Sequence, residues 1–261
     1  MAELRDRYGP VAVVTGASSG IGWAFAEELA KRGFDLVLVA RRVDRLEDLA
    51  RQLTAANGIA VAALPVDLGR ADAAQIILDA TTSHDVGLVV SNAGFGMKGD
   101  HADNDPAAMT EMLMVNCNVP MQLARGFAPR LRARGSGGLI LVSSVEGLIG
   151  CPYSTAYSAS KALVNALGEG LWAELKPDGV DVLTVCPGAT ESEAAGKQGI
   201  DLAKLRNVMP ARDVARASLD NLAEGPTFFP SEIYKATFDQ LLAMPRCDAL
   251  MAMAKGIKGN S

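Results

Sequence analysis

The sequence predicts an α/β fold made of a single doubly wound domain, in which helices flank a parallel sheet of seven strands. Short runs rich in Val, Ile and Leu alternate with helix-length segments along the chain, which is typical of parallel sheets. These runs show no polar alternation, as expected for strands that helices cover on both faces. No linker or internal repeat is visible, so residues 1–261 are expected to form one domain.

The predicted elements follow from the positions of these runs. Strands are expected at seven places: Val11–Val14, Leu36–Ala40, Ala60–Leu64, Gly87–Ser91, Leu139–Ser143, Val182–Cys186 and Thr227–Pro230. Long helices are predicted at Ile21–Arg32, Ala107–Arg132 and Thr155–Leu175. The first ends before Gly33 and the last before Pro177, and both residue types commonly end helices. Residues 231–256 are predicted to add a C-terminal helix.

The composition excludes several classes of protein. The net charge is −5 and no basic stripe is visible, which argues against a nucleic-acid partner. No apolar run approaches the roughly 18 residues of a membrane span. The charged N-terminal stretch precedes no apolar signal segment, so a cytoplasmic location is expected. The four cysteines are isolated and there are only two histidines, which predicts buried, reduced thiols and no metal site.

A glycine turn follows the first predicted strand and opens the first helix. Gly16, Gly20 and Gly22 provide backbone freedom and leave room for a ligand, because they carry no Cβ. The free N–H groups and the positive end of the helix then favour a pyrophosphate. The turn, with Ser18, Ser19 and Ile21, is therefore predicted to bind a dinucleotide. The alternative is a tight turn without a ligand.

The end of the second predicted strand indicates which dinucleotide binds. An acidic residue here would bind the ribose 2′-hydroxyl of NAD, but the chain has Arg41 and Arg42, with Arg45 one turn later. Guanidinium groups can hold a 2′-phosphate that a carboxylate would repel. We therefore predict NADP(H), with NAD(H) less favoured. In the alternative, these arginines are solvated or paired with Asp44 and Glu47.

Two further segments follow strand ends. Asp67, followed by Leu68, is placed to accept a hydrogen bond from an adenine amino group, but a loop-capping aspartate explains it equally well. Asn92, Ala93 and Gly94 follow the fourth strand, where small residues allow close approach of the cofactor or of the glycine turn. A scaffold role and a direct contact both stay open for Asn92.

A tyrosine and a lysine are spaced for acid–base chemistry. Hydride transfer to a ketone leaves negative charge on the carbonyl oxygen, which a proton donor must neutralise. Tyr157 and Lys161 lie one helical turn apart, so they share a face, and the ammonium is expected to lower the pKa of the phenol. Ser144, thirteen residues before the tyrosine, is expected to bind the substrate oxygen. Strand alternation allows only one of Ser143 and Ser144 to serve.

At these positions the chain resembles the short-chain dehydrogenases/reductases over nearly its whole length. The resemblance rests on ordered motifs: the turn from Thr15 to Gly22, Asn92-Ala93-Gly94, Asn116, Ser144, Tyr157-x-x-x-Lys161 and Pro187-Gly188. It implies a Rossmann-type domain, a water relay from Asn116 to Lys161, and a hydrogen bond from Lys161 to the nicotinamide ribose. It also implies cofactor contacts from Pro187, Gly188 and Thr190. The N-terminal segment and the C-terminal helix are similar to a subgroup that includes bacterial hydroxysteroid dehydrogenases.

Residues and resemblance together predict an NADP(H)-dependent oxidoreductase acting on CH–OH groups. It would interconvert a ketone and a secondary alcohol, with Tyr157 as the acid and base. The small-molecule substrate is expected to be a bulky apolar ketone, steroid-like or aryl. The alternative is a catalytically inactive, NADP-sensing regulatory or scaffold protein. An enoyl reductase is disfavoured because its tyrosine and lysine are usually further apart.

Three features concern the substrate side and assembly. Residues 189–210 are predicted to form a lid over the substrate. The apolar side chains of the C-terminal helix either pack on the protein's own sheet or a sister subunit, or form a Met-lined wall of the substrate cavity. In the family, the helices at Ala107–Arg132 and Thr155–Leu175 pair across a twofold axis, which implies a homodimer or homotetramer.

Overall fold

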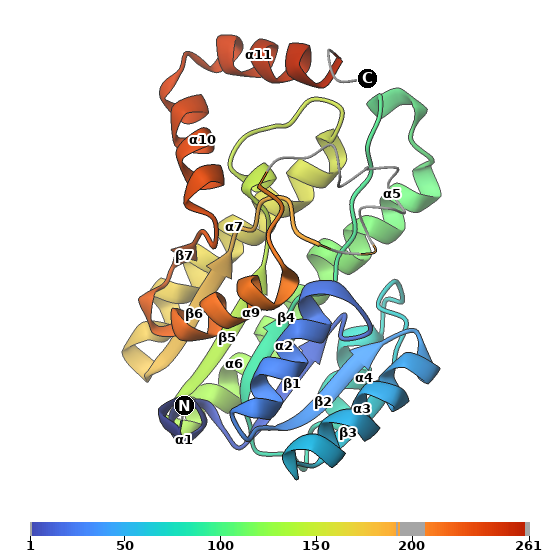
Figure 1. Cartoon of the computed structure of the whole chain (residues 1–261), viewed down its shortest axis with the longest axis vertical. Coiled ribbons are helices and arrows are strands. Elements are labelled where there is room, and N and C mark those ends of the chain that lie inside the picture. The colour runs from blue at the N-terminus through green and yellow to red at the C-terminus, as the bar shows by residue number, and fades with distance from the viewer. Residues whose placement is uncertain (1, 192, 194–206, 259–261) are drawn as a thin grey trace.

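A computed structural model describes residues 2–191, 193 and 207–258 of the chain. The described residues form a seven-stranded sheet in the order β3-β2-β1-β4-β5-β6-β7, in which all neighbouring strands run parallel (Figure 1). The strands are β1 (Val11–Thr15), β2 (Asp35–Ala40), β3 (Val61–Pro65), β4 (Val86–Ser91), β5 (Gly137–Val142), β6 (Val180–Val185) and β7 (Thr227–Phe228). The predicted doubly wound sheet is confirmed, and the predicted strand ends differ from those observed by at most two residues.

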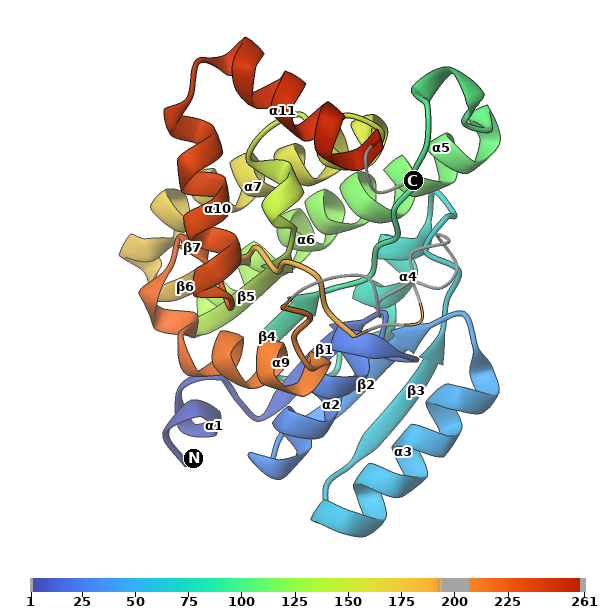
Figure 2. The ribbon, with the colours of Figure 1, turned by 45° about the horizontal axis from the view of Figure 1, so that its top comes forward.

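Helices cover both faces of the sheet (Figure 2). They are α1 (Ala2–Tyr8), α2 (Gly20–Lys31), α3 (Val43–Asn57), α4 (Ala73–Ala80), α5 (Pro106–Leu113), α6 (Val119–Arg134), α7 (Thr155–Leu175), α9 (Ala211–Asp220), α10 (Glu232–Ala243) and α11 (Arg246–Lys258). Helices α2, α3 and α9 pack on one face, and α4, α6 and α7 on the other. Short turns of helix that bear on the site are η2 (Met114–Asn118) and η3 (Val145–Gly147).

The strand alternation explains why two hydrophobic cores form. Ala12 and Val14 of β1 point into the core beneath α2, α3 and α9, whereas Val11 and Val13 point into the core beneath α4, α6 and α7. Neighbouring side chains of a strand point to opposite faces, so a strand covered on both sides must be apolar throughout. The unbroken apolar runs of the sequence are the direct result.

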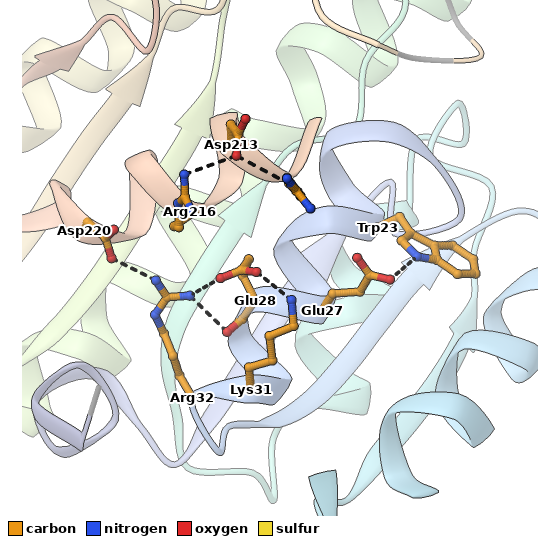
Figure 3. A network of polar contacts seen from close by, with 9 residues as sticks. Trp23, Glu27, Glu28, Lys31, Arg32, Asp213, Arg216 and Asp220 are labelled. Atoms are coloured by element: carbon orange, nitrogen blue, oxygen red, sulfur yellow. Dashed lines mark hydrogen bonds and ion pairs between the residues drawn. The ribbon is translucent and has the colours of Figure 1, made fainter. Parts of the chain in front are cut away.

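Helices α2 and α9 are joined by charged side chains (Figure 3). Arg32, at the end of α2, pairs with Glu28 of the same helix and with Asp220 of α9, each at 2.8 Å. The Arg32 side chain is only 7% exposed, so both carboxylates serve to balance a largely buried charge. The contact fixes α9, which follows the predicted lid in the chain, against the helix that begins at the glycine turn.

The helix predicted over Ala107–Arg132 begins one residue earlier in the structure, at Pro106, and a turn of π-helix interrupts it. Asp105 caps it by accepting hydrogen bonds from the backbone N–H groups of Ala107 (3.2 Å) and Ala108 (3.3 Å), and Pro106 occupies the first turn. Helices α5 and α6 are joined through η2, a turn of π-helix. Such a turn inserts an extra residue into the helix, which changes the direction of the side chains that follow it, and it often occurs at functional sites. The third predicted helix, Thr155–Leu175, coincides with α7.

The prediction of one C-terminal helix over residues 231–256 is wrong, because the chain forms α10 and α11 instead. Pro245 separates them, and the preceding Met244 is extended (φ −75°, ψ 156°), since the proline ring disfavours helical backbone before it. Phe238 and Ala249 pack with Ile149 and other residues near the carboxyl edge of the sheet. The helical extension therefore packs on the chain's own loops at that edge.

The two ends of the predicted lid, residues 189–210, lie side by side. Glu191 donates its backbone N–H to the Met209 carbonyl at 2.9 Å, and Met209 donates to the Ala189 carbonyl at 3.0 Å. Residues 192 and 194–206 of that prediction lie outside the described residues. None of the helices in the described ranges is both long and apolar enough to cross a membrane.

The four cysteines are free, as expected, but they differ in burial. Cys117, Cys151 and Cys186 are buried. Cys247 is exposed near the start of α11, contrary to the expectation of buried thiols.

Two glycines of α7 test how closely this helix packs on the sheet. A Cβ at Gly168 would collide with the Thr184 hydroxyl of β6, whereas one at Gly170 would meet nothing within 4 Å. We expect Gly168→Ala to lower the free energy of unfolding by about 1–3 kcal/mol. Gly170→Ala should raise it by about 0.5–1 kcal/mol, since alanine is the better helix former. Urea unfolding measures both, and equal effects would contradict the close packing of α7.

Candidate active site

The predicted site residues gather at the carboxyl edge of the sheet. Gly16 directly follows β1, Asn92 follows β4, and Ser144 lies two residues after the end of β5. Strands β1 and β4 are neighbours although β2 and β3 come between them in the chain, so the strand order reverses there. In open parallel sheets, ligands bind at such a reversal. The topology therefore brings the glycine turn and the candidate catalytic residues to one edge.

The loop after β4 lies against the glycine turn. The Thr15 hydroxyl accepts hydrogen bonds from the backbone N–H groups of Asn92 (3.0 Å) and Ala93 (3.1 Å), and the Asn92 side chain donates to the Thr15 carbonyl at 2.9 Å. A Cβ on Gly16 would lie 2.9 Å from the Ala93 Cα, and one on Gly22 would meet the Gly16 carbonyl. Glycine is thus required at both positions. These hydrogen bonds favour the scaffold interpretation of Asn92.

The turn leaves backbone donors at the start of α2. Gly20 begins the helix with a φ of +57°, and the preceding Ser19 is extended and makes no side-chain capping bond. Ser18 is buried and Ile21 half-buried beside them. The first N–H groups of a helix have no partner within it and carry the positive end of its dipole. The free donors at the start of α2 therefore fit a pyrophosphate.

Arg42 wraps around this turn. Its guanidinium donates to the Ser18 hydroxyl (3.0 and 3.2 Å), the Ser18 carbonyl (3.1 Å) and the Ser19 hydroxyl (2.8 Å). Glu193 accepts from Arg42 at 2.7 Å and also pairs with Arg45. The two guanidinium groups lower the pKa of the Glu193 carboxyl from 4.5 to about 2. Arg42 and Arg45 thus form an anion site that a carboxylate of the chain itself fills.

Arg41 faces a different group of acidic residues. It donates to Glu111 of α5 at 2.8 Å and lies 3.8 Å from the Asp67 carboxylate. The sequence suggested Asp44 and Glu47 as alternative partners. Among the described residues, neither forms an ion pair with Arg41 or Arg42.

Asp67 caps its own loop. Its Oδ1 accepts a hydrogen bond from the backbone N–H of Gly69 at 3.1 Å, as the loop-capping interpretation expects. The Asp67 side chain remains 51% exposed, whereas Leu68 is buried in the core. A carboxylate oxygen of Asp67 is therefore still accessible to a ligand.

Tyr157 and Lys161 face the same side of α7. The Lys161 ammonium lies 5.7 Å from the centre of the Tyr157 ring and donates a hydrogen bond to the Val142 carbonyl at 2.9 Å. Lys161 is only 4% exposed, and Tyr157 is half-buried. Burial disfavours the charged form and lowers the pKa of Lys161 from 10.5 to about 8.

The pKa of Tyr157 departs from the expectation. Burial raises it well above its ordinary value of 10.0, the Glu146 carboxylate raises it further, and a hydrogen bond with Ser144 acts in the opposite direction. The predicted lowering by Lys161 is not found. The lysine is itself buried with a depressed pKa, and its ammonium donates to a backbone carbonyl rather than to the phenol. The phenol is therefore held in its protonated form at neutral pH.

The two serines after β5 point to different partners. Ser143 donates its hydroxyl to the Lys161 carbonyl at 2.9 Å and so braces α7. Ser144 lies on the other side, where its oxygen accepts a hydrogen bond from the Glu146 backbone at 3.1 Å and its side chain also hydrogen-bonds Tyr157. Of the two, only Ser144 contacts the Tyr157 phenol among the interactions of the described residues.

Asn116 is buried in the π-helical turn rather than exposed on a helix surface. Its side chain accepts from the Phe95 N–H at 3.1 Å and donates to the Phe95 carbonyl at 2.9 Å and to the Ser160 hydroxyl at 3.0 Å. A Cβ on Gly94 would lie 3.0 Å from the Asn116 oxygen and 3.2 Å from the Lys161 ammonium. Asn116 and Lys161 therefore lie on the same side of Gly94, and the absence of a side chain lets the loop approach both of them closely.

The segment after β6 lies next to these residues. The Pro187 carbonyl accepts from the backbone N–H of Val145 at 3.1 Å, and Thr190 donates its hydroxyl to the Gly188 carbonyl at 3.1 Å. A Cβ on Gly188 would collide with the ring of Tyr234 in α10. The C-terminal extension thus reaches the predicted cofactor-contact segment.

Sequence reasoning missed the contacts that four side chains make in this region, namely those of Lys98, Ser160, Tyr234 and Glu193. Each belongs to a loop or helix far away in the chain from the motif it contacts, so spacing gave no signal.

A cavity of about 320 Å³ lies beside the site, between residues 147–150, α7 and Arg246. Tyr157 does not line it. Within the described ranges, no group of His, Cys, Asp and Glu side chains is arranged to hold a metal ion.

The comparisons with known proteins agree with this geometry. A 7beta-hydroxysteroid dehydrogenase from Clostridium sardiniense is 31% identical over 254 residues, which are 97% of both chains. A short-chain dehydrogenase from Sphingobium yanoikuyae, solved in complex with NADPH, is 33% identical, with a TM-score of 0.83 over 97% of this chain and 96% of its own.

A third similar protein is a bulky-bulky ketone specific alcohol dehydrogenase from Comamonas testosteroni. It is 29% identical, with a TM-score of 0.76 over 91% of this chain and 96% of its own. The family model described as short chain dehydrogenase matches residues 10–202. This match spans the glycine turn, both serines, Tyr157 and Lys161, and the chain therefore belongs to the short-chain dehydrogenase family.

Proposed function

We propose that the protein is an NADP(H)-dependent oxidoreductase that interconverts a ketone and a secondary alcohol, with Tyr157 as the acid and base. One observation carries the proposal: a protonated phenol lies beside a hydroxyl and a buried ammonium, at the sheet edge that also bears the glycine turn. The phenol would supply a proton, the hydroxyl a hydrogen bond to the substrate oxygen, and the ammonium a positive charge.

The cofactor assignment rests on the anion sites around the glycine turn. The start of α2 suits the pyrophosphate, and Gly16 and Gly22 let the turn, the helix and the loop after β4 pack closely beside it. Arg42, already held against Ser18, and Arg41 beside it suit a 2′-phosphate. A relative that is 33% identical was solved with NADPH, which supports the phosphorylated cofactor for this chain.

The chemistry then follows from the protein's own groups. A bound nicotinamide cofactor supplies or accepts the hydride. Ser144 positions the substrate oxygen, and Tyr157 gives its proton to that oxygen as the hydride reaches the carbonyl carbon. In the reverse direction the phenolate takes the proton of the alcohol. Lys161 holds positive charge on the same side of α7 as the phenol. The positive charge of an oxidised nicotinamide would favour the phenolate when that cofactor is bound.

The substrate is proposed to be a bulky apolar ketone, steroid-like or aryl. Apolar side chains gather after η3, where Leu148, Ile149 and Cys151 pack with α10 and α11. Two of the similar proteins are a 7beta-hydroxysteroid dehydrogenase and an alcohol dehydrogenase specific for bulky-bulky ketones, which supports the same substrate class.

Assembly and location belong to the same proposal. Leu113 of α5, Met121 of α6 and Leu163 of α7 are large apolar side chains that remain 36–48% exposed, on the helices expected to pair in a homodimer or homotetramer. The free thiols of Cys117, Cys151 and Cys186 suit a reducing cytoplasm. The chain is proposed to act there as one Rossmann-type domain.

Replacement of Tyr157 tests the reaction. A panel of steroid and aryl ketones is assayed by loss of NADPH absorbance. Tyr157→Phe should lower turnover of the best ketone at least about 100-fold, because it removes the only proposed proton donor. NADPH binding, followed by its fluorescence, should remain within about twofold of wild type, since the phenol makes no phosphate contact. Wild-type protein that binds NADPH but turns over no ketone would instead favour the inactive, NADP-sensing alternative.

Two substitutions with opposite expected effects on the Kd for NADPH test the cofactor assignment. Arg42→Ala should raise the Kd for NADPH about tenfold or more and leave that for NADH nearly unchanged, because only NADPH offers a 2′-phosphate. Glu193→Gln should lower the NADPH Kd about two- to fivefold, since it removes the carboxylate that competes for Arg42 and Arg45. Glu191→Gln, the same charge change two positions earlier, is the control. Equal effects on both dinucleotides would refute the 2′-phosphate site.

A further inference from the structure

A second ammonium group lies beside the Tyr157 ring. The nitrogen of Lys98 is 5.8 Å from the ring centre, almost the same distance as that of Lys161 at 5.7 Å. Lys161 comes from the same helix as Tyr157, whereas Lys98 comes from the loop after β4. The phenol is therefore flanked by two cations of different origin, and only one of them belongs to the motif that the sequence revealed.

Lys98 joins three separate segments through its ammonium. It donates to both carboxylate oxygens of Glu146 in η3, at 2.7 and 2.9 Å, and to the hydroxyl of Ser154 at 2.9 Å. An ammonium has three N–H donors, and these contacts provide three acceptors. The side chains are partly shielded, with Lys98 32% and Glu146 26% exposed, so the pair is screened less by water than a surface pair.

The position of Ser154 links this contact to Tyr157. Ser154 precedes α7 directly and makes no side-chain capping bond to the helix. Its hydroxyl accepts from Lys98 instead, and next to it the Gly99 N–H donates to the Tyr153 carbonyl at 2.9 Å. The loop after β4 is thus fixed to the start of the helix that carries Tyr157.

The position of Glu146 gives the contact an electrostatic meaning. Glu146 follows Ser144 by two residues, and its negative charge is one of the causes that raise the pKa of Tyr157. The other groups that act on the phenol are the Ser144 hydroxyl, which lowers its pKa, and the thiols of Cys151 and Cys186, which raise it. Lys98 is the cation paired with Glu146, so it offsets the one full negative charge in this set.

We propose that Lys98 is a positioning residue of the active site, which holds η3 against the start of α7 and neutralises Glu146 beside Tyr157. This inference rests on the proposed function, because it concerns the acid and base of that reaction. A neutral donor could make the same contacts with Ser154 and Glu146. Only a cation removes the field of the carboxylate from the phenol.

The charge role is tested by Lys98→Met, Glu146→Gln and the double variant. The alcohol of the fastest ketone in the panel is oxidised with NADP⁺ while pH is varied. Its rate should rise as Tyr157 loses its proton. Lys98→Met leaves Glu146 uncompensated and should move that rise to higher pH by about one unit. Glu146→Gln should move it to lower pH, and the double variant should return close to wild type.

Two further variants separate charge from structure. Lys98→Arg keeps the cation and should restore the wild-type pH profile. Lys31→Met removes a lysine that pairs with Glu28 on α2, away from the site, and should leave the profile unchanged. A lower rate at every pH with no shift of the profile in Lys98→Met would overturn the proposal, because that result indicates a purely structural contact.

A second readout does not depend on turnover. The phenolate absorbance that Tyr157→Phe removes is followed as pH rises with saturating NADP⁺, whose positive nicotinamide favours the phenolate, in the wild-type, Lys98→Met and Glu146→Gln backgrounds. The phenolate should appear at higher pH in Lys98→Met than in Glu146→Gln. If the wild type turns over no ketone, the proposed function fails, and this titration still decides the role of Lys98. Identical titrations in the three backgrounds would overturn it.

Discussion

The buried ammonium of Lys161 is the charge around which the neighbouring groups of the proposed active site are arranged. A lysine that is 4% exposed is costly to keep charged, which is why its pKa is lowered to about 8. The Val142 carbonyl accepts one of its hydrogen bonds, and the Ser143 hydroxyl braces the backbone behind it. The loop at Gly94 approaches the nitrogen closely, on the side where Asn116 also lies. A ribose hydroxyl of a bound cofactor would add a further acceptor for this buried cation.

The same principle applies at the other end of the proposed cofactor site. Arg42 and Arg45 are satisfied by Glu193, and Arg41 by Glu111. These acidic side chains keep the arginines ordered, but a 2′-phosphate must displace a carboxylate to bind there. Under the proposed function, the affinity for NADP(H) would thus be a difference between two ionic contacts rather than the strength of one. The charge around Tyr157 is balanced in a similar way, by Glu146 and Lys98.

Regular elements and short-range motifs were predictable from the sequence. Strands β1, β2, β4, β5 and β6 were visible because both of their faces are buried. Helix α7 was placed correctly because Pro177 follows it closely. Tyr157 and Lys161 were predicted to share a face because helical spacing alone determines it. Pro245 was a signal in the sequence for the break between α10 and α11. The apolar residues on either side of it led instead to the prediction of one continuous helix.

Long-range contacts were not predictable. The π-helical turn that buries Asn116 depends on the Phe95 backbone and on Ser160, neither of which is near it in the chain. The Lys98–Glu146 pair joins residues 48 positions apart, and Glu193 reaches arginines about 150 positions away. The prediction of a lowered pKa for Tyr157 failed for the same reason, since burial and Glu146 both raise that pKa.

The most direct test of the central claim is a crystal structure of the protein bound to NADPH. The phenol of Tyr157 and the ammonium of Lys161 should both face the nicotinamide half of the cofactor. The 2′-phosphate should lie on Arg42, with Glu193 displaced from it. A cofactor bound away from the glycine turn, or one from which Tyr157 and Lys161 point away, would contradict the proposed mechanism.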